Sequence, residues 1–170
     1  ALWLRYYNEL SDVIREGGAG FSDWSGVYSA EPCYIVQSDF SYMISDDMFV
    51  DFELAHLQES CEKIKNTIFH LDGPGELSHL DAILGIGELD CVQWIPGEGN
   101  PPSAQWQEVN RKIKAAGKSL YITGDPANFD AVMADLGDGT RAYYAIREYD
   151  DAFGGLQNKD VLTRFIDKWK

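Results

Sequence analysis

The sequence predicts an α/β fold in which parallel β-strands alternate with crossover helices. Five short segments have the apolar and aromatic composition of buried strands, and segments with helical periodicity separate them. Successive strands begin roughly 22 to 34 residues apart, which leaves room for a crossover helix after each strand. A doubly wound sheet and a (β/α) barrel both fit this pattern. A full barrel of eight units needs about 250 residues, whereas these 170 residues supply at most five strands.

The first part of the chain predicts a helix, a loop and a strand. Residues 1–18 form the helix, because apolar side chains recur at helical spacing until Gly17 and Gly18 end the pattern. That apolar stripe consists of Trp3, Tyr6, Tyr7, Leu10, Val13 and Ile14. A loop rich in glycine, serine and aromatic residues follows at 19–31. CYIVQSDF (Cys33–Phe40) is then predicted to be a buried strand.

The rest of the chain repeats the alternation, so that 33–148 form βα repeats within one domain of residues 1–170. After Cys33–Phe40, further strands are predicted at Thr67–Leu71, Asp90–Ile95, Ser119–Thr123 and Arg141–Ile146. The helices between the strands are predicted to begin near Ser45, Leu77, Ser103 and Asp125. Asp125 precedes Pro126, a pair typical of a helix start, so we interpret Asp125 as a cap. The segment 149–170 is predicted to be an amphipathic C-terminal helix.

Composition and charge exclude several classes of partner. The chain has 14 Lys and Arg against 28 Asp and Glu, a formal net charge of −14, which argues against nucleic acid and anionic membrane surfaces. No apolar run approaches the length of a membrane span, and the N-terminus lacks a signal-peptide pattern. The three cysteines form no CxxC pair. We therefore expect a reducing, cytoplasmic setting.

Polar and ionisable residues follow every predicted strand, where parallel α/β folds place their chemistry. We expect five of them, from four of the predicted strands, to converge at one end of the sheet. Asp39 lies near the end of the first strand, His70 and Asp72 at the end of the second, Gln93 in the third, and Glu148 follows the fifth. The candidate catalytic residues are Asp39, His70 and Asp72.

His70 and Asp72 form the most distinctive pair. Two residues apart on an extended segment, their side chains point the same way. This geometry suits two ligands of one zinc or other divalent ion, or an imidazole held beside a carboxylate. The alternative is a polar strand end in which Asp72 opens the DGPG turn.

Other residues near the strand exits are candidates for binding a substrate. They are Tyr42, Gln93, Trp94 and Glu98. Trp94, next to Pro96 and Gly97, forms either a stacking wall for a ligand or part of a loop core. His79 lies in the first turn of its helix, where it would help to line the mouth of a pocket, whereas His56 is expected to face solvent.

Two stretches resemble the C-terminal half of the uroporphyrinogen decarboxylase-like superfamily. They are VQSDFSYMISDDMF and IFHLDGPGELSHLDAILGIGELDCVQWIPGEG, in which HLDGPG and QWIPG are the most specific blocks. The resemblance covers roughly residues 24–150. It implies the C-terminal half, about five strands, of a TIM-type (β/α)8 barrel, with the first three or so strands absent. That superfamily also contains cobalamin-dependent methyltransferases.

The resemblance implies two chemistries. In a decarboxylase acting on a tetrapyrrole, Asp39 or Asp72 would stabilise a protonated pyrrole intermediate, although the arginines of that branch come from the N-terminal half. In a methyltransferase, zinc would activate a thiol that takes the methyl group of a corrinoid presented by a partner protein. The methyltransferase branch has His-x-Cys where this chain has His70-x-Asp72, so the implied zinc ligands are His70, Asp72 and Glu148.

The alternative hypothesis, outside the enzyme class, is a non-catalytic half-barrel subunit or fragment that binds a small molecule or a partner chain. The strand Cys33–Phe40 is largely apolar and expects neighbours on both edges. The N-terminal helix would cover part of this surface but would not supply the missing ladder hydrogen bonds. We therefore expect a missing N-terminal half, or self-association through the Cys33–Phe40 edge.

Overall fold

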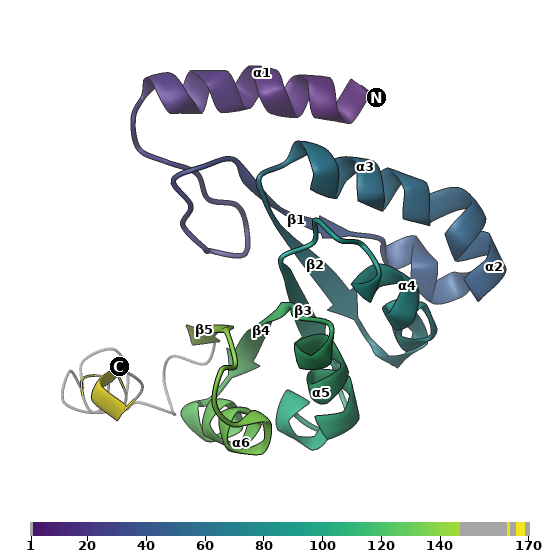
Figure 1. The fold of residues 1–170 in the computed structure, drawn as a ribbon, viewed down its shortest axis with the longest axis vertical. Helices are drawn as coiled ribbons and strands as arrows, with labels where there is room; N and C mark the ends of the chain where they lie inside the picture. Colours follow the sequence, from purple (N-terminus) through teal and green to yellow (C-terminus); the bar gives the residue numbers. More distant parts are fainter. Residues whose placement is uncertain (1, 147–162, 164–165, 169–170) are drawn as a thin grey trace.

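The computed structural model describes residues 2–146, 163 and 166–168, and its centre is a five-stranded parallel sheet (Figure 1). The strands lie side by side in chain order, each paired in parallel with the next. Their bounds are β1 (Cys33–Gln37), β2 (Asn66–Asp72), β3 (Cys91–Ile95), β4 (Ser119–Gly124) and β5 (Ala142–Ile146). The predicted α/β class and the parallel arrangement are confirmed.

Helices connect the strands. They are α1 (Leu2–Glu16), α2 (Asp46–Phe49), α3 (Ala55–Lys63), α4 (Leu80–Leu84), α5 (Gln107–Ala115) and α6 (Pro126–Leu136), and a π-helical stretch, Val50–Leu54, joins α2 to α3. Two of the three predicted helix caps are present: the Ser45 side chain accepts a hydrogen bond from the Met48 N–H, and Asp125 accepts one from the Asn128 N–H. The third, Ser103, was wrong, because Ser103 opens a short 3-10 helix (Ser103–Gln105) and α5 begins at Gln107 without a side-chain cap. Among the described residues, no helix combines the length and apolarity that crossing a bilayer requires.

The two faces of the sheet differ in what covers them. Alternate strand residues such as Phe69, Val92 and Leu120 pack beneath the helices in the main core. The opposite, open face carries a smaller cluster of Ile35, Ile68, Cys91 and Tyr121. Figure 1 shows α3 to α6 on one side of the sheet only. One-sided helices and sequential strands are consistent with half of a TIM-type barrel, because a doubly wound sheet has helices on both faces.

Residues 17–32 cover part of the open face. This segment closes on itself through an antiparallel bridge between Phe21 and Ser29. Its Val27 packs against the small cluster, and the Ser25 carbonyl accepts a hydrogen bond of 2.5 Å from the Tyr121 hydroxyl. The sequence predicted only a loop here. In the structure the loop is an ordered cover on the open face of the sheet.

Side chains cap two polar groups of β1, the edge strand. The Tyr7 hydroxyl of α1 donates to the Cys33 carbonyl at 2.9 Å, and the Ile35 N–H donates to Asp23 Oδ2 at 2.6 Å. α1 therefore supplies one hydrogen bond that we expected no helix to supply. Its predicted apolar stripe otherwise stays largely exposed, with Leu10 and Val13 each about two-thirds accessible (64% and 66%).

Replacing Asp23 with alanine is expected to lower the free energy of unfolding by about 2–3 kcal/mol, because two backbone N–H groups lose a charged acceptor. Asp23 Oδ1 accepts from the Ser25 N–H at 2.8 Å and Oδ2 from the Ile35 N–H. Urea unfolding measures the change. Asp12→Ala is the control, since Asp12 makes only an exposed pair with Arg15 and should change stability by less than about 1 kcal/mol. Equal losses in both variants would contradict this role of Asp23.

The fifth strand exit and the C-terminal helix fall mainly beyond the described part of the chain. Glu148, the third proposed zinc ligand, lies outside it, as does Arg147. Within the predicted helix 149–170, residues 163 and 166–168 are described, and they are helical.

Candidate functional site

The carboxyl ends of β1, β2 and β3 bring several predicted site residues together. In the strand register, Gln37 lies beside His70, and His70 beside Gln93. Side chains at matched positions of parallel strands point to the same face. His70 and Gln93 therefore both project onto the open face, one layer beyond the apolar cluster around Ile68 and Cys91.

Gln93 holds the His70 ring in one orientation. His70 Nδ1 lies 2.5 Å from Gln93 Oε1. An amide oxygen only accepts hydrogen bonds, so Nδ1 carries a proton, and in the neutral imidazole Nε2 then keeps its lone pair. The edge of Trp24, from the 17–32 loop, meets the His70 ring with centroids 5.1 Å apart. The ring is thereby fixed on two sides, and its basic nitrogen remains available.

Gln93 itself is 0% exposed, and its Nε2 amide group has no hydrogen-bond partner within the described residues. A buried amide without a partner costs stability, about 1–3 kcal/mol. Neither Gln93 nor His70 lines the hollows at the strand ends, so the pair lies beneath them.

Asp72 connects this pair to a buried carboxyl group. Asp72 Oδ2 lies 3.9 Å from His70 Nε2, and the Asp72 backbone N–H donates to Glu76 Oε2 at 2.8 Å. Glu76 is only 1% exposed. Burial raises the pKa of Glu76 to about 7, and the nearby charges of Asp72 and Asp39 raise it further, against the lowering effect of the Asp72 N–H.

A cavity of about 320 Å³ lies directly beyond these strand ends. It brings together four predicted residues with Glu76, which the sequence analysis missed: Asp39, Tyr42, Asp72 and Glu98. Every charged residue that lines it, within the described chain, is a carboxylate. A second hollow of about 740 Å³ at the ends of β3 and β4 shares the lining residues Pro96, Gly97, Glu98 and Asn100. Together they form an acidic groove along the ends of β1 to β4.

The glycines of DGPG let Tyr42 reach the cavity wall. Gly73 has φ +82°, a conformation that L side chains rarely adopt, and its position faces the Tyr42 ring. A Cβ atom at Gly75 would collide with the same ring. The motif that carries the family resemblance therefore has a local packing role as well.

Two residues predicted near the pocket lie elsewhere. Trp94 is buried on the helix-covered face, where its ring meets Trp106 edge to face, so it belongs to the core. His79 is buried rather than at the pocket mouth. Its ring stacks on Phe49, and its Nε2 donates to the Ser41 carbonyl at 2.9 Å. His56, in contrast, is exposed on α3 as predicted.

His70 and Asp72 supply two donors suited to a divalent metal ion. Among the described residues, no three His, Cys, Asp or Glu side chains gather as a metal site. The three cysteines are free thiols, and burial raises the pKa of each of them, Cys33, Cys61 and Cys91. They are buried or half-buried and line neither hollow at the strand ends.

We compared the chain with models of protein families, with curated proteins and with solved structures, and none of them matched. The chemistry of this site therefore has to be argued from its own geometry.

Proposed function

We propose that this chain is a decarboxylase-like lyase that removes CO2 from an acidic side chain of a pyrrole-type ring, as its resemblance to uroporphyrinogen decarboxylase-like proteins implies for a tetrapyrrole. The observation that carries the proposal is the acidic cavity at the ends of β1 to β3, in which Glu76 has a pKa of about 7. The cavity combines a proton donor that works near neutral pH with carboxylates that stabilise positive charge.

The reaction needs these two properties in sequence. A proton adds to a ring carbon and makes the ring cationic. The bond to the carboxylate carbon then breaks, CO2 leaves, and the electron pair of that bond returns to the ring system. The side-chain carbon takes up a proton and the ring proton is released, so that the net change exchanges CO2 for hydrogen.

Four residues of the site are assigned roles in these reaction steps. Glu76 lines the cavity and supplies the first proton, because its pKa keeps it about half protonated at pH 7. Asp72 and Asp39 stabilise the cationic ring. His70 Nε2, 3.9 Å from Asp72, accepts the released proton, since Gln93 keeps the Nδ1 proton in place.

Zinc-dependent methyl transfer from a methyl-corrinoid to a thiol is the second candidate. The contact between His70 Nδ1 and Gln93 favours it, since this contact leaves Nε2 available beside Asp72. Histidines that bind a metal usually donate their other ring N–H to an oxygen in this way. When bound, zinc would lower the pKa of the incoming thiol. His70 and Asp72 would hold the ion, and a corrinoid protein would be the partner.

Two assays on the same purified protein decide between these functions. The proposal expects CO2 release from uroporphyrinogen without added metal, at a rate that falls as the pH rises above 7. Methyl transfer from methylcobalamin to a small thiol that requires zinc would support the second candidate instead. If neither reaction occurs, the enzymatic proposal is wrong, and the hypothesis of a non-catalytic subunit remains.

Gln93→Met is expected to lower the activity about 10- to 100-fold, the usual effect of removing the group that orients an active histidine. The stability should change little, because the substitution also removes the buried amide group that lacks a partner. The readouts are the decarboxylation rate and urea unfolding. Gln58→Met, at an exposed position of α3, is the matched control. Equal activity in both variants would contradict the role given to Gln93.

A further inference from the structure

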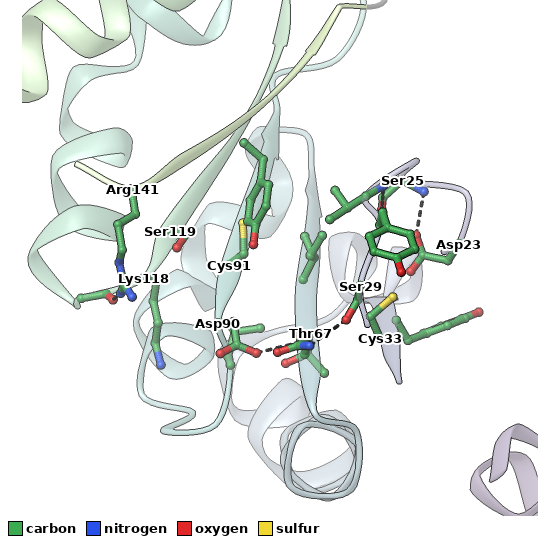
Figure 2. Close-up of a pocket in the computed structure, with 18 of the residues that line it drawn as sticks. Asp23, Ser25, Ser29, Cys33, Thr67, Asp90, Cys91, Lys118, Ser119 and Arg141 are labelled. Atoms are coloured by element: carbon green, nitrogen blue, oxygen red, sulfur yellow. Dashed lines mark hydrogen bonds between the residues drawn. The ribbon is translucent and has the colours of Figure 1, made fainter. Parts of the chain in front are cut away.

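A further cavity lies at the opposite end of the sheet from the proposed active site. It has a volume of about 480 Å³, within the range of small-molecule sites. Its walls are the first residues of the strands and part of the 17–32 loop, as Figure 2 shows. None of the residues assigned to decarboxylation lines it, so its ligand is independent of the proposed function.

The two cations at this cavity, Lys118 and Arg141, donate hydrogen bonds to backbone carbonyls. Lys118 Nζ donates to the carbonyls of Ile86 (2.7 Å) and Gly87 (3.0 Å), and Arg141 Nη2 donates to the Gly117 carbonyl (2.5 Å). Neither cation has an ion-pair partner among the described residues. Carbonyl groups satisfy donors without neutralising charge, so neither positive charge is compensated by a carboxylate at ion-pair distance within the described part of the chain. On α5, by contrast, Arg111 and Lys112 each pair with an aspartate.

The acidic residues of the cavity already serve the fold. Asp23 accepts hydrogen bonds from two backbone N–H groups, those of Ser25 and Ile35. Asp90 Oδ2 accepts from the Thr67 N–H at 2.9 Å, a contact drawn in Figure 2. The cavity therefore has two cations without an ion-pair partner among the described residues, Lys118 and Arg141, and two carboxylates, Asp23 and Asp90, that are engaged with backbone N–H groups.

Aromatic side chains complete the walls. Tyr28, Tyr143 and Val27 line the cavity, whereas Tyr34 borders it but turns its ring away, against Trp3 and Tyr7 of α1. Tyr28 lies directly against Gly20, which has φ +77°, and 68% of Tyr28 stays exposed to solvent. Apolar rings next to a cationic end suit a ligand with a planar body and one acidic group.

We propose that this cavity binds a small aromatic carboxylate, with its carboxylate at Lys118 and Arg141 and its ring against the tyrosines. Arginine presents a planar fork that matches a carboxylate, and Lys118 adds a point charge. The net charge of −14 opposes non-specific binding of anions, so saturable binding of an anion requires a local site of this kind.

Isothermal titration of the whole chain with benzoate tests the proposal, with benzamide as the neutral probe of the same shape. Benzoate is expected to bind saturably and benzamide at least about tenfold more weakly, since only benzoate carries the charge. Arg141→Gln and Lys118→Gln should each weaken benzoate binding about tenfold or more. Glutamine keeps a donor for the carbonyl contacts, and circular dichroism checks that each variant is folded.

Lys65→Gln is the matched control, because Lys65 is exposed and does not line the cavity. It should bind benzoate like the unchanged protein. The proposal is wrong if benzoate does not bind, if benzamide binds equally well, or if Lys65→Gln weakens binding as much as Arg141→Gln. It is also wrong if the two cavity variants lose stability but keep their affinity for benzoate. Lys118 and Arg141 would then serve only the hydrogen bonds to the carbonyls of the nearby turns.

Discussion

Replacing Glu76 with glutamine is expected to remove a pH dependence of stability worth about 3 kcal/mol. The pKa of Glu76 rises from 4.5 to about 7 in the folded chain. Well below pH 4.5 the carboxyl group is protonated in both the folded and unfolded states. As the pH rises from 4.5 to 7, the unfolded chain releases this proton and the folded chain retains it. The free energy of unfolding therefore falls across this window, and the loss is complete above pH 7.

Glutamine suits this test because it is neutral at every pH and its amide oxygen can still accept the Asp72 N–H. The variant should match the unchanged protein near pH 4 and be more stable by about 3 kcal/mol at pH 8. Urea unfolding at the two pH values measures the difference. Glu62→Gln, on the exposed surface of α3, is the control and should leave the pH dependence in place. A Glu76→Gln curve parallel to that of the unchanged protein would contradict the raised pKa.

The same substitution connects stability with function. Natural proteins retain destabilising groups mainly where activity needs them, and a buried carboxyl group at a cavity wall is such a group. Glu76→Gln should gain stability at pH 8 and lose decarboxylation at every pH, because glutamine has no proton to donate. A variant that gained stability and kept full activity would leave Glu76 without a catalytic role.

Much of the fold followed from local patterns. The apolar segments marked all five strands to within a few residues, because buried parallel strands have near-continuous apolar sequences. The first strand was predicted to reach Phe40, but β1 ends at Gln37, and a 3-10 turn at Asp39–Met43 carries Tyr42 toward the cavity. His70 and Asp72 share one side because the side-chain period of a strand is two.

Features that depend on distant contacts did not follow from the sequence. Two hydrogen bonds hold the 17–32 loop: the Ile35 N–H donates to the Asp23 carboxylate, and the Tyr121 hydroxyl donates to the Ser25 carbonyl. The partners are 12 and 96 residues apart in the chain. Glu76 follows a glycine-rich turn and resembles any solvated loop acid, so no local signal marks its burial. Trp94 directly follows Gln93 on the strand, so the two side chains point to opposite faces of the sheet. This signal was available from the sequence and argued against placing both residues in one site.

A large functional effect is also expected from His70→Ala, which should lower kcat/KM for decarboxylation about 10²- to 10⁴-fold, the usual contribution of a general acid or base. His70 Nε2 is the basic nitrogen beside Asp72, and its neighbour Gln93 fixes the proton on Nδ1. Without the imidazole, the ring proton has no acceptor near the carboxylate that stabilises the cationic intermediate. Steady-state rates across pH 5 to 9 measure the loss.

Stability must be separated from chemistry in this variant, because the His70 ring also contacts Trp24 and is largely buried. His70→Gln keeps a polar side chain of similar length without a basic ring nitrogen, so it should lose as much activity as His70→Ala while retaining more stability. His56→Ala, at an exposed position of α3, is the control and should keep full activity. If His70→Gln retained activity with an unchanged pH profile, His70 would only support the 17–32 loop. A loss in both His70 variants at matched stability assigns the proton transfer to the imidazole itself.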